Sequence, residues 1–342
     1  MRRNRTDVSE ADEALLFAPP AGVSAPPAAG VSASGAAASP GRIVMLSDTH
    51  LATPGRGAGG VAALRPLWAG ADELILNGDT AEIADAKVRG PAARAVVELL
   101  RLAEADGVRV TFIAGNHDPL ITDRRYLRLA GGEVFLTHGD VLHPAISPWT
   151  DHGRSLARLH ADAVMSLDPG KARSSDAKLA LDAKLAACGQ ASAAQWDHFV
   201  THPHRLSALD RLTPRRLRRH TALARKLVKA AYYWQTIPRR AMGFARRFAP
   251  ESRVFVFGHI HRAGVWTDRG AGPGGADRVI INTGAYQNPR NPHAVVIEGR
   301  ALTLWPVTFD PAGHRLANRP RAAFTLDRPA VARPADGRGA AA

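Results

Sequence analysis

Cysteine is almost missing from this chain of 342 residues, which contains only Cys188. A lone cysteine cannot form an internal disulfide, which excludes a disulfide-stapled secreted domain and favours a reducing compartment. Apolar runs of the length that a membrane span needs, about 20 residues, are missing as well. The apolar segment at 15–17 is far too short for the core of a secretion signal. We therefore expect a soluble, cytoplasmic protein that is at most peripheral at a membrane.

Both ends of the chain lack the periodicity of helices and strands. Residues 1–40 are rich in Ala, Pro, Gly and Ser, which predicts a disordered tail that buries too little apolar surface to fold. Residues 311–342 are rich in Pro, Ala and Arg, and we expect a loose C-terminal tail there. Hydrophobic residues make up 45% of the whole chain, which is enough to build a sizeable core between these tails.

Apolar runs of strand length occur in two blocks, and helical periods fill the segment between them. The first block predicts strands over 42–46, 73–76, 108–114 and 133–137 and a helix over 91–106. The second block predicts strands over 253–257, 278–281, 294–297 and 302–305, the last two forming a hairpin. Helices are expected over 155–167, 175–188, 214–234 and 238–248. This pattern predicts an α/β layered domain made of 41–140 and 253–310, with 141–252 as a basic helical insertion or cap.

Side chains of the kind that ligate metals follow five of the expected strands. They are Asp48, His50, Asp79, Asn116, His138, His259 and His261. Carboxylate, imidazole and amide groups are hard or borderline donors, and alternate residues of an extended segment face the same side. Seven ligands are too many for one tetrahedral ion, but they suit two ions that share a bridging carboxylate. The sequence therefore predicts a dinuclear metal centre at the C-terminal edge of the sheet.

Five short motifs at these positions resemble those of the calcineurin-like metallophosphoesterases and stand in the order of that family. The motifs are Asp48-x-His50, Gly78-Asp79, Gly115-Asn116-His117-Asp118, His138-Gly139 and Gly258-His259-x-His261. The resemblance covers about 42–140 and 253–307, and it implies a four-layered αββα sandwich. It also implies two divalent metal ions, with manganese as the first choice and iron, zinc or magnesium as alternatives.

The resemblance implies a role for each matching residue. Asp48, His50 and His261 would hold the first metal, Asn116, His138 and His259 would hold the second, and Asp79 would bridge them. His117 would give a proton to the leaving oxygen. The expected chemistry is hydrolysis of a phosphoester, in which two cations about 3.5–4 Å apart clamp phosphate oxygens and activate a hydroxide for in-line attack. An imidazole suits the proton donor because its unperturbed pKa is about 6.5.

Residues that would contact the substrate are less clearly marked. Glu82 stands where the protein-phosphatase branch of the family has an acid that orients the catalytic histidine, and here it either does so or is a solvated loop carboxylate. That branch has Arg at the next position, whereas this chain has Ile83. The cation that binds the phosphate is therefore open among Arg56, Arg262 and Arg290, which lie near motif loops.

Acidic residues are nearly missing from 205–247, where thirteen Arg or Lys stand against one acid, Asp210. The expected helix ends in Tyr232, Tyr233 and Trp234 and has one apolar stripe, which predicts a basic amphipathic helix. The stripe consists of Leu217, Ala224, Leu227, Val228 and Ala231. Such a helix suits an anionic membrane surface, and it also suits the backbone of nucleic acid.

The layout of the insertion is similar to that of the UDP-2,3-diacylglucosamine pyrophosphatases, although that branch has Arg where His117 stands. The resemblance implies a phosphodiester or pyrophosphate substrate such as a nucleotide-linked lipid. The alternatives are a nuclease or nucleotide phosphodiesterase with the same site, and a non-catalytic membrane- or protein-binding scaffold.

Overall fold

The computed structural model describes residues 41–53, 57–150, 152–168, 170, 174–201, 215–287, 291–310 and 312–331, which lie within the compact unit Ser39–Ala342. Of residues 198–201, 215–222 and 225 it describes only the helical backbone. The predicted N-terminal tail at 1–40 lies outside the described residues, and so do residues 332–342 of the predicted C-terminal tail.

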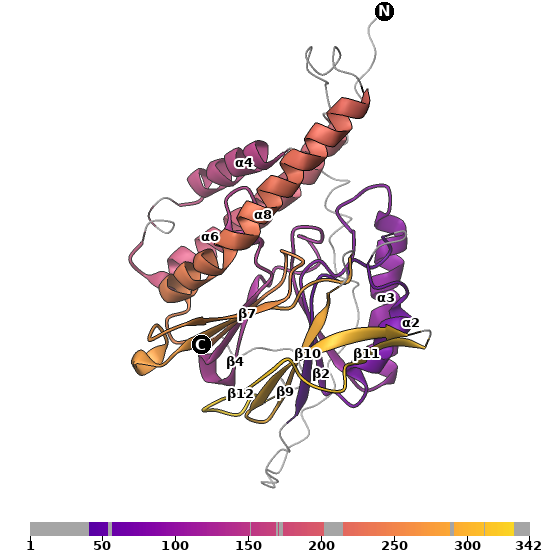
Figure 1. Cartoon of the computed structure of the whole chain (residues 1–342), viewed down its shortest axis with the longest axis vertical. Helices are drawn as coiled ribbons and strands as arrows, with labels where there is room; N and C mark the ends of the chain where they lie inside the picture. The colour runs from indigo at the N-terminus through magenta and orange to yellow at the C-terminus, as the bar shows by residue number, and fades with distance from the viewer. Residues whose placement is uncertain are drawn as a thin grey trace, which may run out of the picture. The chain divides into compact units, whose positions relative to one another are not determined.

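The described strands form two sheets (Figure 1). One is seven-stranded, in the order β11-β10-β9-β1-β2-β3 with β12 paired to β10, and the other is five-stranded, in the order β4-β5-β6-β8-β7. The seven strands are β1 (Arg42–Leu46), β2 (Glu73–Asn77), β3 (Arg109–Ile113), β9 (His293–Glu298), β10 (Ala301–Asp310), β11 (Gly313–Leu316) and β12 (Ala322–Thr325). The five strands are β4 (Tyr126–Leu129), β5 (Val134–Thr137), β6 (Val254–Phe257), β7 (Gly264–Asp268) and β8 (Arg278–Asn282).

The parallel strands bring their carboxyl ends to one edge of each sheet. β1, β2 and β3 run parallel to one another, and so do β5, β6 and β8. The predicted metal ligands follow five of these six strands, all but β8. The expected closing hairpin is confirmed by the antiparallel pairing of β9 with β10.

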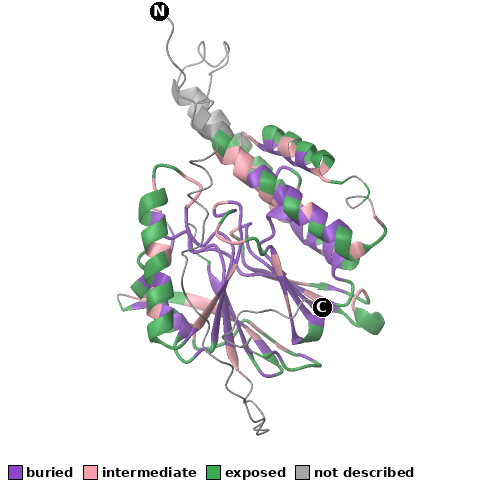
Figure 2. Ribbon diagram, turned by 180° about the vertical axis from the view of Figure 1, so that it is seen from behind, coloured by how far each residue is buried: buried purple, intermediate pink, exposed green. Residues whose placement is uncertain are grey.

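Both faces of each sheet are apolar, so each sheet needs cover on both sides. In β1, Ile43 and Met45 point into one buried cluster, which lies between the two sheets, whereas Val44 and Leu46 point into another. That second cluster contains α2 (Val61–Leu64) and α3 (Arg89–Ala105). A third cluster joins the outer face of the five-stranded sheet to the helices of the insertion. The predicted four-layered αββα sandwich is thus confirmed, and Figure 2 shows its buried strands.

The insertion connects β5 to β6, which are adjacent strands paired from Val134↔Val254 onward. Its helices are α4 (Gly153–Ser166), α6 (Ala177–Thr201) and α8 (Arg215–Phe248). The C-terminal half of α8 buries Ile237, Phe244 and Phe248 in the cluster on the five-stranded sheet. The insertion therefore supplies the outer helical layer of this sheet. The bounds of this basic helical insertion or cap, 141–252, stay a prediction.

The prediction of two helices over 214–234 and 238–248 is wrong, because α8 is continuous and contains Pro238. A proline inside a helix costs about 3 kcal/mol. Tyr233 and Ile237 before the proline and Ala241 after it are all buried in the same cluster, so packing outweighs that cost. α6 likewise continues to Thr201, beyond the expected end at 188.

Four short strands were not expected from the sequence: β4, β7, β11 and β12. β4 and β7 pair antiparallel at the two edges of the five-stranded sheet. β11 and β12 both pair with β10, so the prediction of a loose tail is wrong for residues 313–316 and 322–325. None of the described helices, α8 included, has the length and apolarity that a membrane span requires.

Candidate metal centre

The predicted ligands follow the strands on sharply turned backbone. Asp48 and His50 follow β1, Asp79 follows β2, and His259 and His261 follow β6. All five have positive φ, at 52°, 44°, 50°, 70° and 54° in this order. Residues other than glycine rarely adopt this conformation, which costs on the order of 1–3 kcal/mol and concentrates at functional sites. The chain holds its polar side chains here against a local conformational cost.

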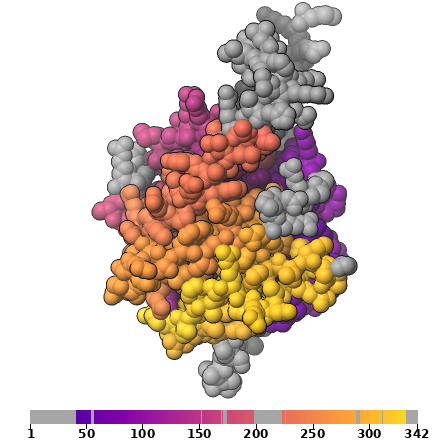
Figure 3. Space-filling model, in the orientation of Figure 1, coloured from indigo at the N-terminus to yellow at the C-terminus, as the bar shows by residue number. Residues whose placement is uncertain are grey.

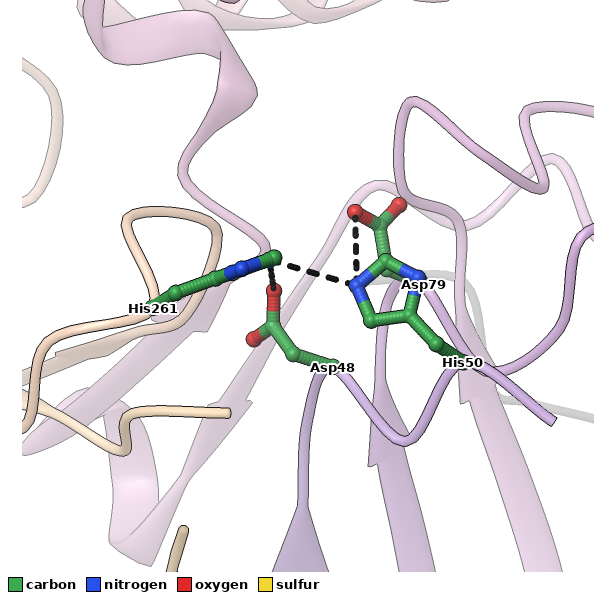
Figure 4. Close-up of side chains that lie close together, drawn as sticks. All are labelled: Asp48, His50, Asp79 and His261. Atoms are coloured by element: carbon green, nitrogen blue, oxygen red, sulfur yellow. Dashed lines mark hydrogen bonds and ion pairs between the residues drawn. The ribbon is translucent and has the colours of Figure 1, made fainter. Parts of the chain in front are cut away.

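A first group of side chains converges from both sheets (Figure 4). Asp48, His50, Asp79 and His261 point toward one another and lie close enough to share one metal ion. His261 Nε2 lies 3.3 Å from Asp48 Oδ1 and 3.2 Å from His50 Nε2. His50 Nε2 lies 3.9 Å from Asp79 Oδ2.

A second group shares Asp79 with the first and adds His138 and His259. His138 Nε2 lies 3.2 Å from Asp79 Oδ2. His138 Nδ1 donates to the carbonyl of Asn77 at 3.0 Å, and His259 Nε2 donates to the carbonyl of Ile146 at 2.8 Å. These bonds fix the ring orientation and leave one nitrogen of each imidazole for a metal, as partners of metal-ligating histidines commonly do.

Asn116 gives a direct test of whether the residues fit two cations. Its Oδ1 is buried, and among the described residues it has no hydrogen-bond partner. His138 Nε2 is also buried, and its neighbour there is Asp79 Oδ2 at 3.2 Å, the carboxylate with which it would share an ion. Unpaired buried polar atoms are uncommon in folded proteins, so each needs a partner of another kind. Carboxylate, imidazole and amide oxygen together suit divalent metals, and the residues fit two ions that share Asp79.

His117 lies beside both groups and is held by Glu82. His117 Nδ1 lies 2.6 Å from Glu82 Oε2, and His50 Nδ1 lies 2.8 Å from Glu82 Oε1. The carboxylate of Glu82 therefore accepts hydrogen bonds from two histidines. Of the two alternatives for Glu82, a residue that orients the histidine or a solvated loop carboxylate, the geometry fits the first. His117 Nε2 faces the centre, 4.0 Å from Asp79 Oδ2, and 28% of its side chain is exposed.

Asp118 ties the loop of His117 to the loop of Asp79. Its carboxylate accepts from the backbone N–H of Gly115 at 2.8 Å, of Asp79 at 3.1 Å and of Thr80 at 2.6 Å. Gly115 is needed for this approach, because a Cβ there would lie 2.2 Å from Asp79 Oδ1. The three hydrogen bonds to Asp118 therefore fix the loop of Asp79, the residue whose carboxylate belongs to both groups of candidate ligands.

Charges in the centre shift the pKa values of its histidines in opposite directions. Burial opposes a charge on His117, but the carboxylates of Asp79 and Glu82 outweigh it and raise the pKa of His117 to about 9. Burial likewise opposes a charge on His138, and Asp79 outweighs it and raises the pKa of His138 to about 10. Burial, together with the charge of His138, lowers the pKa of His259 to about 4.

Three tryptophans from the insertion contact the loops of the centre, and none of these contacts was predicted from the sequence. Trp196 of α6 donates its indole N–H to the carbonyl of Asn116 at 3.0 Å. Trp234 of α8 donates to the carbonyl of Ile260 at 3.1 Å. The ring of Trp149 lies 5.4 Å from that of His259. No motif marks these residues, because each contact joins segments far apart in the sequence.

A buried ion pair beneath the centre was also missed. Arg125 Nη2 donates to Asp140 Oδ2 at 2.5 Å, and both side chains are almost fully buried. Asp140 follows the predicted His138-Gly139 motif directly, and that position was the available signal.

Of the three arginines predicted as candidates for binding the phosphate, the structure describes only one. Arg56 and Arg290 lie outside the described residues. Arg262 is exposed, and its guanidinium lies 5.8 Å from the ring centre of Trp234. The structure thus places Arg262 beside the His261 loop, and its contact with substrate stays a prediction.

A family model described as calcineurin-like phosphoesterase matches residues 41–263, which include all of the candidate ligands. No curated protein matches the sequence.

Solved structures that resemble this chain include two phosphatases and a Vps29 protein. A dimetal phosphatase from Danio rerio is 13% identical over 78% of this chain and 96% of its own, with a TM-score of 0.36. Vps29 from Chaetomium thermophilum is 11% identical over 83% of this chain and 99% of its own, with a TM-score of 0.38. A cold-active protein-tyrosine phosphatase from a psychrophilic Shewanella is 12% identical over 81% of this chain and 80% of its own, with a TM-score of 0.35. At such identities and scores these likenesses carry no argument about this chain.

Proposed function

The chain belongs to the calcineurin-like phosphoesterase family, and we propose that it cleaves a phosphodiester or pyrophosphate bond in a substrate such as a nucleotide-linked lipid. Membership and the buried cluster of His and Asp make it a metal-dependent phosphoesterase. The observation that carries the proposal is the carboxylate of Asp79, which belongs to both groups of candidate ligands.

The residues divide into two proposed metal sites. Asp48, His50 and His261 would hold one ion, Asn116, His138 and His259 would hold the other, and Asp79 would serve both. Manganese is our first choice, with iron, zinc or magnesium as alternatives, because this donor set accepts several metals. When bound, such a pair of ions supplies Lewis acidity toward phosphate oxygens and toward the attacking water.

His117 is the proposed general acid. Its Nδ1 is engaged by Glu82, so the proton that it can give away sits on Nε2, which faces the centre. Protonation of the leaving oxygen lowers the barrier most when that oxygen is a poor leaving group. Glu82 holds the ring in place and favours its charged form.

A direct test uses bis-p-nitrophenyl phosphate with Mn²⁺. Asp79→Asn should abolish turnover, because it removes the charge that both sites share. His117→Ala should retain metal content but reduce kcat, by about 10²–10⁴-fold for substrates with poor leaving groups and by less for p-nitrophenol. A metal-loaded protein that turns over no phosphoester would support the scaffold alternative and contradict the proposal.

The lipid part of the proposal is supported by the composition and exposure of the insertion. Segment 205–247 carries a net charge of +12, and α8 exposes large apolar side chains. We expect hydrolysis of an acylated nucleotide-sugar pyrophosphate to exceed that of single-stranded DNA at equal phosphate concentration. The reverse order of rates, measured with the same enzyme and metal, would favour the nuclease alternative.

A further inference from the structure

The N-terminal half of the described part of α8 presents apolar side chains to solvent. Leu223, Leu227, Val228 and Tyr232 are 55%, 58%, 69% and 67% exposed. Successive residues of an α-helix are about 100° apart, so these side chains lie on one half of the helix circumference. Lys226 and Lys229 are exposed on the other half. We call the first half the α8 apolar arc; it consists of Leu223, Ala224, Leu227, Val228, Ala231 and Tyr232.

Exposure changes sharply along this one helix. Figure 2 shows α8 passing from exposed residues to an alternation of buried and exposed ones, where it lies on the sheet layer. On the face shown in Figure 3, atoms of α8 lie at the surface of the molecule. Contiguous apolar surface of this kind marks an interaction site more often than an isolated exposed leucine does.

We propose that the α8 apolar arc docks on an anionic lipid surface, and that docking acts on the metal centre through the next turn of the same helix. The proposal rests on the proposed phosphoesterase function for its second half only, because docking requires no catalysis.

The charge of the surrounding segment favours an anionic lipid surface as the partner of the α8 apolar arc. Residues 205–247 contain thirteen Arg or Lys and one acid, which favours an anionic partner. Nucleic acid would satisfy these charges, but it offers nothing to the apolar arc. An anionic bilayer satisfies both: the apolar half of such a helix sinks about 5–10 Å into the boundary between headgroups and acyl chains. Lys226 and Lys229 can then reach lipid phosphates with their long side chains.

The residues that follow the arc in α8 contact the loop of His259 and His261, directly through Trp234 and indirectly through Trp149. Tyr233 follows the arc directly, is buried, and its ring lies 5.2 Å from that of Trp149. Trp149 in turn packs against His259 at 5.4 Å. Trp234 donates to the carbonyl of Ile260, the residue between His259 and His261, at 3.1 Å.

Docking can therefore bias the loop that carries two of the proposed metal ligands. A ligand shifts an equilibrium only by its different affinity for the two states. A lipid surface that binds α8 best in the orientation shown here would favour the Trp234–Ile260 hydrogen bond. We expect anionic lipid to raise turnover even of a substrate that is itself soluble in water.

The first experiment measures binding alone, with EDTA present so that activity plays no part. Wild-type protein should cosediment with vesicles of phosphatidylcholine and phosphatidylglycerol, and weakly with pure phosphatidylcholine. The double variant Leu227→Glu/Val228→Glu should bind the anionic vesicles at least about tenfold more weakly. A matched control, Val97→Glu/Leu100→Glu, adds the same charge to exposed apolar positions of α3.

Three outcomes would overturn docking. The first is equal binding to neutral and anionic vesicles. The second is an α3 control that weakens binding as much as the α8 variant does. The third is binding to a DNA duplex and to no vesicles. The last result would assign the basic segment to nucleic acid.

The second experiment measures the coupling. With Mn²⁺ and bis-p-nitrophenyl phosphate, anionic vesicles should raise wild-type kcat by at least about threefold. Trp234→Phe removes the indole N–H but keeps an aromatic ring, so it should bind vesicles like wild type and lose the stimulation. An unchanged wild-type rate, or equal stimulation of Trp234→Phe, would contradict the coupling. Vesicle binding without turnover of any phosphoester would refute the proposed function and the coupling, and would leave docking supported.

Discussion

Glu82 is the residue whose replacement tests the arrangement of the centre most sharply. Its two carboxylate oxygens accept from His117 Nδ1 at 2.6 Å and from His50 Nδ1 at 2.8 Å. Glu82→Gln keeps the shape of the side chain but turns one acceptor into an NH₂ donor. One of the two histidines then faces a donor instead of an acceptor, and the negative charge between them is lost.

The magnitude follows from the kind of bond that is removed. A hydrogen bond to a charged group contributes about 1.5–3 kcal/mol, which corresponds to about a 10- to 150-fold loss of kcat. The pH profile should change as well. The carboxylates of Asp79 and Glu82 raise the pKa of His117 to about 9 against the opposing effect of burial. Without the Glu82 charge this pKa falls, so the protonated acid is lost at lower pH.

The assay is the dependence of kcat on pH at saturating Mn²⁺, with one substrate of good and one of poor leaving group. We expect the basic limb of the profile to move to lower pH in Glu82→Gln, with the larger loss for the poor leaving group. Glu73→Gln is the matched control, since Glu73 is also buried and ion-paired, 2.7 Å from Arg109 Nη2, but lies in β2 away from the centre.

The reasoning would be refuted by either of two results. One is an unchanged basic limb in Glu82→Gln, which would mean that Glu82 does not set the protonation of His117. The other is an equal shift in the Glu73→Gln control.

Three further predictions follow from the centre and its support. Metal affinity should rise with pH, because a cation must displace a proton from His138. Burial opposes the charge on His138, but Asp79 outweighs it and raises the pKa of His138 to about 10. Calorimetry in buffers of different ionisation enthalpy should show the release of this proton, and identical heats would contradict the prediction. Gly115→Ala should weaken metal binding by at least about tenfold, because the new Cβ would lie 2.2 Å from Asp79 Oδ1. Gly60→Ala is the control and should leave metal binding unchanged, because the space around its Cβ is open. Arg125→Ala should lower the free energy of unfolding by about 3–5 kcal/mol in urea titrations, because Asp140 would be left as an uncompensated buried charge; a loss below about 1 kcal/mol would mean that the pair is not buried in solution.

The convergence of the candidate ligands could be predicted because it rests on short-range rules. Asp48, Asp79 and His138 each follow an apolar run of strand length, and parallel strands bring such ends to one edge. The structure brings these side chains together from both sheets, as the motif order implied. The roles of individual residues as ligands stay predictions that metal titration of the variants can test.

The partners of the ligands could not be predicted, because they are not encoded locally. His138 and His259 are oriented by backbone carbonyls of Asn77 and Ile146, and a carbonyl leaves no mark in the sequence. Trp196 is 80 residues from Asn116, whose carbonyl it binds. Only the packing of α6 against the loop creates that contact.

Local rules also failed where packing opposes them. Pro238 predicts a helix end, but the buried side chains before and after it hold α8 together. The short strand β12, Ala322–Thr325, alternates between half-buried and exposed residues, and its three apolar residues are fewer than the four to eight that mark a buried strand. Its place is set by pairing with β10, which the sequence of β12 alone does not show.

The order of the strands has a consequence for the making of the protein. β1 is the first described strand to leave the ribosome, yet its antiparallel neighbour β9 is synthesised about 250 residues later, a delay of roughly 13–50 s at ordinary elongation rates. His259, whose backbone N–H binds the carboxylate of Asp48, arrives 211 residues after it. Throughout this interval the nascent chain carries an unpaired sheet edge and an incomplete ligand set. Capture of the proposed pair of ions would therefore come late in biosynthesis, and a chain released before residue 259 would lack His259 and His261, one proposed ligand of each ion.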